Sequence, residues 1–236
     1  MPKKAVAYLK QVDKVYVNDA YNSLSIEGYR VAPELIEKVR TGNWSPDNNE
    51  QDKEHRNAMS ARGYWQAFQA VKDSIKDVLN GKNPGLVAYN DHSRWYRELF
   101  APGVTAGILK ASDLAGYRND QVYIKGSKYI PLNPDAVRDA MPAFFDLLKK
   151  EKEPAVRAVL GHFIFVYIHP YMDGNGRIGR FLMNIMLASG GYSWTVIPVE
   201  KRNEYMNALE RASVDQDILL FSRFMAKLVQ KSGKSI

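Results

Sequence analysis

The sequence predicts a mostly all-α protein, a helical bundle that carries one small β-hairpin. Most segments repeat their apolar residues at helical spacing, and the longest such pattern runs from Lys53 to Leu79. Segment 117–131 differs, because strand-forming residues there flank a short polar turn. The chain has 236 residues, of which 45% are hydrophobic and 25% charged. This composition excludes wholesale disorder and is sufficient for one sizeable core.

Glycine and proline define the ends of the predicted elements. A helix over 14–27 is expected to end near Gly28, and Pro33 suits the first turn of a short helix that ends before Gly42. Turn-forming residues predict a loop over 41–49. The later helices are also bounded by proline or glycine, and they are predicted over 135–149, 154–169, 175–189, 200–212 and 216–230, before a frayed tail at 233–236.

The hairpin is predicted from local composition. Val122, Tyr123 and Ile124 are strand formers, residues 125–128 can turn, and the chain can return before Pro131 stops pairing. Because an isolated hairpin is only marginally stable, it is expected to lie on the helical body.

Charge and composition limit the classes of function. The formal net charge of +7 suits a polyanionic ligand or nucleic acid, or it serves solubility alone. The absence of cysteine excludes disulfides, cysteine-based zinc sites and thiol catalysis. His162 is predicted to be a core histidine, since no third metal ligand accompanies it. The first residues lack the apolar core of a signal peptide and no stretch is long enough to span a bilayer, so a cytoplasmic protein is expected.

The most informative stretch is HPYMDGNGRIGR, at 169–180. Gly174, Asn175 and Gly176 lie between two predicted helices, where their backbone amides can converge into an anion-binding nest at a helix N-terminus. Arg177 and Arg180 follow on one face of the next helix, and two guanidinium groups beside a nest suit a polyphosphate.

Two further residues of this stretch supply chemistry. Asp173 precedes the nest, where a carboxylate beside phosphates can hold Mg²⁺. His169 lies four residues earlier, and a neutral imidazole can take a proton from an incoming hydroxyl. Each feature alone is common in proteins without such a site, but their joint occurrence in one window favours attack of a hydroxyl on a nucleotide phosphate.

The same stretch resembles the signature of the Fic/Doc family, H-P-F-x-D/E-G-N-G-R-x-x-R, with Tyr171 in place of phenylalanine. The resemblance implies the Fic fold and transfer of AMP from ATP to a Ser, Thr or Tyr hydroxyl of a target protein, with release of pyrophosphate. It assigns the base to His169, Mg²⁺ to Asp173, and phosphate binding to Gly174, Asn175, Gly176, Arg177 and Arg180. It also suggests that Asn184 reaches the nucleoside, and that the hairpin is a flap on which a target docks as an added strand.

A second constellation suggests regulation. The sequence SLSIEG, from Ser23 to Gly28, resembles the inhibitory motif S/T-x-x-x-E-G/N of the family. Ser23 and Glu27 are four residues apart and share a helix face. By resemblance, Glu27 reaches Arg180 and occupies the site of the γ-phosphate.

These assignments divide the chain into an N-terminal region, 1–50, with an inhibitory helix at about 14–28, and a Fic core, 51–232. Removal of AMP, or transfer of another nucleotide or phosphate-containing group, stays an alternative activity of the same site. A basic nucleic-acid-binding or protein-binding module with an inactive site is the alternative from another class. The oligomeric state stays open, with a homo-oligomer among the possibilities.

Overall fold

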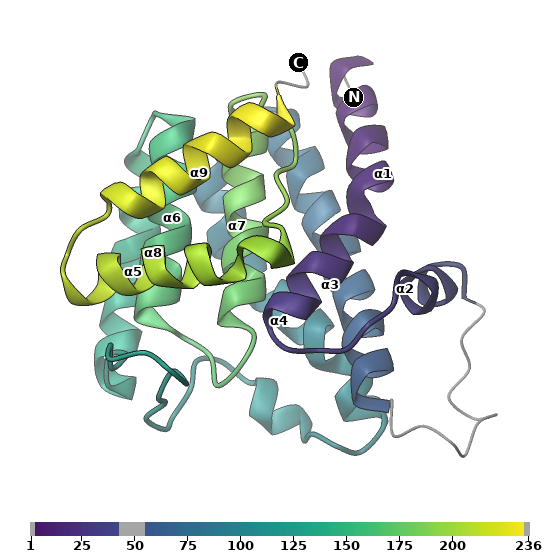
Figure 1. The fold of residues 1–236 in the computed structure, drawn as a ribbon, viewed down its shortest axis with the longest axis horizontal. Coiled ribbons are helices and arrows are strands. Elements are labelled where there is room, and N and C mark those ends of the chain that lie inside the picture. The colour runs from purple at the N-terminus through teal and green to yellow at the C-terminus, as the bar shows by residue number, and fades with distance from the viewer. Residues whose placement is uncertain (1–2, 43–54, 234–236) are drawn as a thin grey trace.

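The computed structural model describes residues 3–42 and 55–233, and it confirms a mostly helical fold (Figure 1). The helices are α1 (Lys3–Ile26), α2 (Pro33–Arg40), α3 (His55–Leu79), α4 (Pro84–Thr105), α5 (Pro134–Lys150), α6 (Pro154–Ile168), α7 (Asn175–Ser189), α8 (Arg202–Val214) and α9 (Leu219–Ser232), with short 3-10 helices η2 (Ala111–Leu114) and η3 (Val199–Lys201).

Helix α7 is the centre of the bundle. It packs against α6, α3, α4 and α1, and α8 and α9 cross in front of it (Figure 1). All of its residues except Gly176 and Ser189 are buried. A helix that is buried on every side must find partners for each polar side chain it carries. The four polar residues of its buried set therefore lie in defined contacts, and two of them are arginines.

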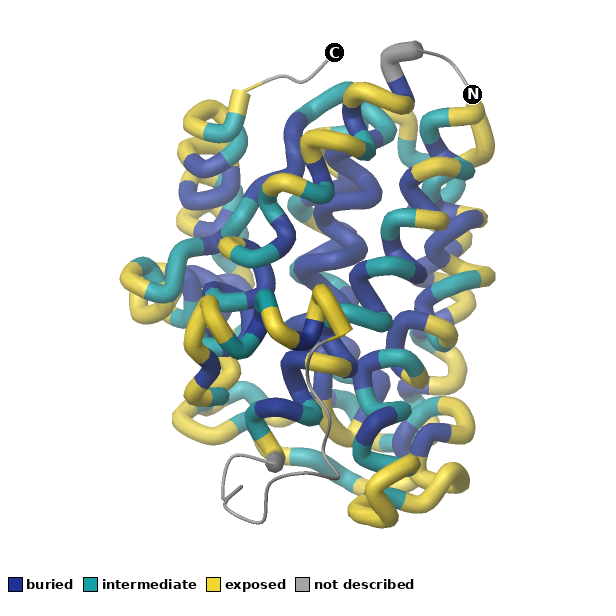
Figure 2. The backbone as a smooth tube through the Cα atoms, turned by 90° about the vertical axis from the view of Figure 1, so that its right-hand side faces the viewer, coloured by how far each residue is buried: buried dark blue, intermediate teal, exposed yellow. Residues whose placement is uncertain are grey.

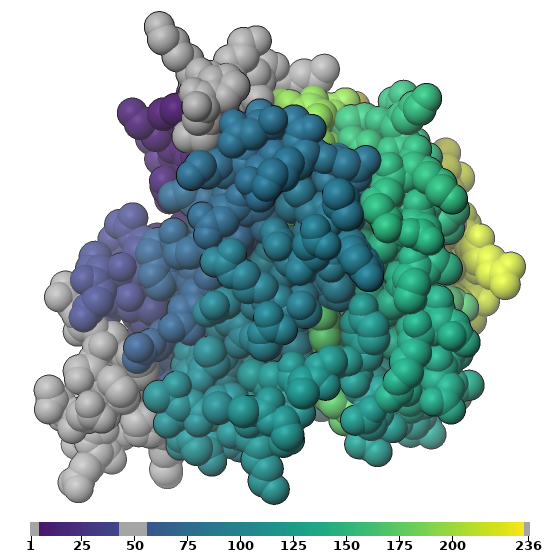
Figure 3. Space-filling model, turned by 180° about the vertical axis from the view of Figure 1, so that it is seen from behind, coloured from purple at the N-terminus to yellow at the C-terminus, as the bar shows by residue number. Residues whose placement is uncertain are grey.

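Buried residues are concentrated in the middle of the molecule. Figure 2 shows buried backbone running through the centre, with exposed residues on the outer faces of the helices and in the connections at both ends. Seen from behind, α3 and α4 cover most of the surface, and α5 and α6 lie along one side (Figure 3). None of the helices in the described part of the chain has the length and apolarity that crossing a membrane requires.

The N-terminal half is more helical than the sequence analysis predicted. Helix α1 begins at Lys3 rather than at residue 14, because Ala5, Tyr8 and Val12 continue its buried face. Helix α4 was not predicted at all. Its Pro84 occupies the first turn, where proline is tolerated, and the Asn83 side chain caps the helix by accepting from the amide of Leu86 at 3.0 Å.

The predicted β-hairpin flap is wrong, since segment 117–131 contains no strand. A turn does form where it was expected, and the amide of Ser127 donates to the carbonyl of Ile124 at 3.1 Å. The two arms, however, do not form a ladder. The predicted loop over 43–49 and the end of the predicted tail, 234–236, lie outside the described residues.

A buried arginine replaces the missing ladder. Arg118 is only 3% exposed, and its guanidinium donates to the backbone carbonyls of Asp120, in the first arm of the flap, and of Leu132, directly after the second arm. Backbone groups that strands would have paired are thus satisfied by a side chain. A tertiary contact of this kind leaves no periodicity in the sequence, which explains the error.

The buried histidine predicts a pH-dependent stability. His162 is fully buried, its Nε2 lies 2.8 Å from the Tyr205 hydroxyl, and burial lowers its pKa to about 3. The unfolded chain takes up this proton near pH 6.5, so the contribution of neutral His162 is complete above that pH and is lost as the pH falls toward 3.

We expect this residue to lower the free energy of unfolding by about 2 kcal/mol between pH 8 and pH 5. Urea denaturation at the two pH values measures it. In a His162→Gln variant, whose amide can still reach the Tyr205 hydroxyl, the difference between the two pH values should shrink by about that amount. The same pH dependence in both proteins would contradict the prediction.

Candidate active site

The site is built on the sharp connection between α6 and α7. Helix α6 ends where His169 adopts a left-handed conformation, with φ 55°. Asn175 then fixes the loop, because its side chain accepts from the amide of Tyr171 at 2.9 Å and donates to the carbonyl of the same residue at 2.8 Å. Gly174, with φ 82°, is the N-cap of α7. The asparagine of the motif thus holds the shape of the loop with both of its polar atoms.

Both glycines of the motif are in close contact with other elements. A Cβ atom at Gly174 would lie 2.9 Å from Cε2 of Phe100, on α4. At Gly176 it would lie 2.4 Å from Oε1 of Glu27. The inhibitory carboxylate predicted from sequence therefore touches the backbone of the predicted anion nest.

His169 is held as a neutral imidazole. Its Nδ1 lies 3.1 Å from the carbonyl oxygen of Val166, so Nδ1 carries the proton and Nε2 keeps its lone pair. Burial lowers the pKa of the imidazole, which keeps it neutral at physiological pH. The backbone carbonyl of His169 accepts from Nε of Arg118 at 2.8 Å, so the arginine that braces the flap also braces this residue.

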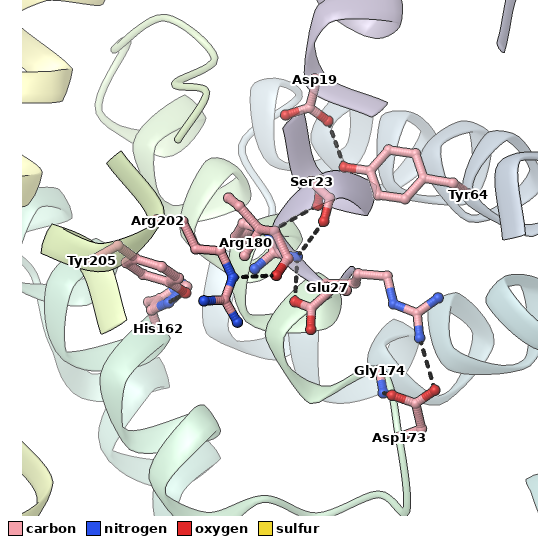
Figure 4. Close-up of polar contacts among 12 residues, drawn as sticks. Asp19, Ser23, Glu27, Tyr64, His162, Asp173, Gly174, Arg180, Arg202 and Tyr205 are labelled. Atoms are coloured by element: carbon pink, nitrogen blue, oxygen red, sulfur yellow. Dashed lines mark hydrogen bonds and ion pairs between the residues drawn. The ribbon is translucent and has the colours of Figure 1, made fainter. Parts of the chain in front are cut away.

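Arg180 joins α7 to the end of α1 (Figure 4). Its Nε donates to the hydroxyl of Ser23 at 2.8 Å, and its Nη2 donates to the carbonyl of Ser23 at 3.1 Å and to Oε1 of Glu27 at 2.6 Å. Its side chain is 4% exposed, and Nη1 is buried without a hydrogen-bond partner. Burial acts to lower the pKa of Arg180, but Glu27, Tyr205 and Tyr64 raise it above its ordinary value. The group is therefore a buried, permanent cation.

A buried carboxyl group supports this end of α1. Asp19 lies one turn before Ser23 and accepts a hydrogen bond from the Tyr64 hydroxyl at 2.6 Å (Figure 4). It also accepts from Nε1 of Trp194 at 2.9 Å. Burial raises the pKa of Asp19 to about 6. Sequence analysis missed it. The signal was present in the spacing, because residues 19, 23 and 27 share one face of the helix.

Asp173 and Arg177 form the outer part of the site. Oδ1 of Asp173 accepts from the amide of Gly174 at 2.6 Å, and Oδ2 lies 3.2 Å from Nη2 of Arg177. The two side chains differ in burial, with Asp173 59% exposed and Arg177 1%. Nε of Arg177 is buried without a partner, like Nη1 of Arg180. Each of the two guanidinium groups beside the nest therefore has an N–H donor without a hydrogen-bond partner.

Residues 91–187, which include this loop, match the Fic/DOC family. The chain is 38% identical over 228 residues to the protein named protein adenylyltransferase Fic of Drosophila willistoni, and 37% identical over 234 residues to that of Drosophila grimshawi. The chain belongs to the Fic/DOC family. These alignments cover 93% and 97% of this chain but only 41% and 44% of the two relatives, so the chain spans less than half of their length.

Solved Fic structures share the fold. A Fic domain-containing signaling protein from Bacteroides thetaiotaomicron superposes with a TM-score of 0.70 at 19% identity, covering 94% of this chain and 85% of that one. Fic-1 from C. elegans gives a TM-score of 0.71 at 22% identity, covering 96% and 63%. The helical arrangement is therefore that of a Fic domain.

The predicted nucleoside contact lies apart from the Fic loop. Asn184 is buried, its amide nitrogen donates to the carbonyls of Arg180 and Thr195, and its amide oxygen accepts from the Thr195 amide at 2.7 Å. These bonds use both of its amide hydrogens. The residue ties α7 to the extended segment after it, and its contacts give no support to a role in nucleoside binding.

The flap residues lie at the surface. Tyr123 is 75% exposed, and Val122 and Ile124 are half-buried. The tip of the flap is tied to α8, where Glu210 accepts from the Ser127 hydroxyl and, at 2.7 Å, from the amide of Lys128. No local pattern predicts this anchor, since 82 residues separate the partners of the second bond.

The contact between Gly176 and Glu27 can be tested through stability. A Gly176→Ala methyl group must displace the Glu27 carboxylate, so we expect a loss of about 1–3 kcal/mol in the free energy of unfolding. In a Glu27→Gly background the closest obstruction is gone and only Nη1 of Arg180, at 3.2 Å, stays near the methyl group. The loss should therefore be smaller by more than about 0.5 kcal/mol. A double-mutant cycle followed by urea denaturation measures this coupling.

Gly161→Ala is the matched control. Gly161 is also a helical glycine, at a buried position of α6, but a Cβ there would meet only the flexible end of Leu148 at 3.1 Å. Its cost should be the same with and without Glu27. Equal costs of Gly176→Ala in the two backgrounds would mean that Glu27 does not rest against the nest.

Proposed function

We propose that this chain is an autoinhibited protein adenylyltransferase, which transfers AMP from Mg-ATP to a Ser, Thr or Tyr hydroxyl of a target protein and releases pyrophosphate. The observation that carries the proposal is the convergence of an imidazole base, a nest of amides and two arginines with unpartnered N–H donors at the junction of α6 and α7. The two Drosophila relatives named protein adenylyltransferase Fic support the same reaction.

The N-terminus of α7 offers unpaired backbone N–H groups to the phosphates. The first intrahelical bond is donated by Ile178 to the carbonyl of Gly174 at 3.0 Å, so the amides of Asn175, Gly176 and Arg177 have no partner within the helix. Together with the positive end of the helix dipole, they suit phosphate oxygens. Arg177 and Arg180 add charge-assisted bonds to the β- and γ-phosphates.

The transfer step uses His169. Its Nε2 accepts the proton of the target hydroxyl while that oxygen attacks the α-phosphorus. The bond between the α-phosphorus and the oxygen bridging to the β-phosphate breaks, and pyrophosphate leaves with that electron pair. AMP stays on the target oxygen. The exposed flap, which begins directly after Gly116 and is braced by Arg118 against His169, is where we expect the target segment to dock.

Asp173 fits the magnesium ion that ATP brings. Its carboxylate is exposed beside the nest, and Mg²⁺ in nucleotide sites takes one or two carboxylate oxygens, with phosphates and water completing its shell. Among the described residues, no cluster of three or more His, Cys, Asp or Glu side chains could hold a metal ion by itself. Bound there, Mg²⁺ would neutralise charge on the phosphates.

Glu27 supplies the inhibition. Its carboxylate pairs with Arg180 and touches Gly176, so it lies where a terminal phosphate would be bound. At 4 Å and an effective dielectric constant of 20, two like charges repel by about 4 kcal/mol. That repulsion disfavours a productively bound triphosphate by up to about a thousandfold.

The test incubates the wild-type and Glu27→Gly proteins with Mg²⁺ and ATP labelled on either the α- or the γ-phosphate. We expect the α-label alone to appear on protein, and more of it with Glu27→Gly. His169→Ala in that background should lower transfer by about 10²–10⁴-fold while Mg-ATP still binds. Transfer of the γ-label would mean phosphorylation, and no transfer by Glu27→Gly to itself or to any protein in a cell extract would contradict the proposal.

A further inference from the structure

We infer that Tyr29 positions the Arg177 guanidinium for nucleotide binding, so that the connection between α1 and α2 completes the same site that Glu27 obstructs. The inference rests on the proposed function, since it concerns how the nucleotide is held. Glu27 then opposes nucleotide binding, while Tyr29, two positions later in the sequence, favours it.

Aromatic rings, rather than carboxylates, hold Arg177 in place. Its guanidinium carbon lies 5.2 Å from the centre of the Tyr29 ring and 5.0 Å from that of Phe100. Its ion-pair partner among the described residues is Asp173, at 3.2 Å, whose side chain is 59% exposed and therefore well hydrated. Contacts with ring faces leave the N–H edge of a guanidinium group for oxygen ligands, and Nε of Arg177 has no partner.

The backbone of Tyr29 is held by hydrogen bonds that do not involve the Glu27 side chain. Gly28, with φ 87°, ends α1 in a Schellman turn, in which the amide of Gly28 donates to Ser25 at 3.0 Å and the amide of Tyr29 donates to Leu24 at 3.1 Å. The next residue is also anchored, since the amide of Arg30 donates to Oδ1 of Asn57, on α3, at 3.1 Å. Replacing Glu27 therefore leaves these backbone anchors of Tyr29 in place.

The other ring connects Arg177 to the catalytic loop. Phe100 packs edge-on against Tyr96 at 5.2 Å, and Tyr96 stacks on Tyr171 of the loop at 3.8 Å. Tyr29 closes the row at its other end, where Arg56 of α3 also lies over its ring at 5.6 Å. One continuous row of rings and guanidinium groups thus runs from the loop to the end of the inhibitory segment, with Arg177 inside it.

The experiment compares Tyr29 variants in the Glu27→Gly background, where the nucleotide has free access. Calorimetry gives the dissociation constant of Mg bound to a non-hydrolysable ATP analogue. Tyr29→Phe keeps the ring and should bind within about twofold of its parent. Tyr29→Leu keeps apolar volume without a ring face and should bind about 3- to 10-fold more weakly, with KM for ATP raised by the same factor and kcat nearly unchanged.

A merely structural role would lower the melting temperature of Tyr29→Leu and leave its dissociation constant equal to that of Tyr29→Phe, and this result would overturn the inference. Tighter binding by Tyr29→Leu would also overturn it. Tyr29→Met replaces Tyr29→Leu if the latter does not fold. Binding by the Glu27→Gly parent is measured first. If this parent bound no Mg-ATP analogue, that result would contradict the proposed function as well as the inference, before any Tyr29 variant is tested.

Discussion

The contact between Arg180 and the end of α1 is the interaction on which the rest of the site depends. Arg180 belongs to the buried central helix, so its charge must be compensated inside the molecule. Ser23 offers two oxygens and Glu27 offers a carboxylate. A triphosphate would offer the same kind of ligand. In the proposed reaction the protein and the nucleotide therefore compete for one buried cation, and regulation needs only α1 and the residue that follows it.

This competition explains why α1 is held so firmly. Asp19, one turn before Ser23, is bonded to Tyr64 of α3 and to Trp194 in the segment after α7. Arg202 of α8 donates to the last carbonyl of the helix, that of Ile26, at 2.8 Å. An inhibitory side chain on a fraying helix end would lose its position to thermal motion. At this anchored end Glu27 pairs with Arg180, and Tyr29, just beyond it, lies over the guanidinium group of Arg177.

Sequence analysis located the loop of the site, but not the residues that support it. The residues from His169 to Arg180 could be assigned because they are contiguous, and the loop folds on itself through Asn175. Arg118, Glu210 and Phe100 act across long sequence separations, through contacts that leave no local pattern. The flap was misjudged for this reason, since its strand-forming residues indicated a ladder where a buried arginine bonds both arms instead.

The central claim is that Glu27 competes with a terminal phosphate for Arg180, and the most direct test compares the binding of Mg-ATP and Mg-ADP by calorimetry. The proteins are His169→Ala, which avoids turnover, with and without Glu27→Gly. The account predicts that loss of Glu27 strengthens ATP binding by up to about a thousandfold and ADP binding much less. Equal strengthening for both nucleotides, or none for either, would contradict it.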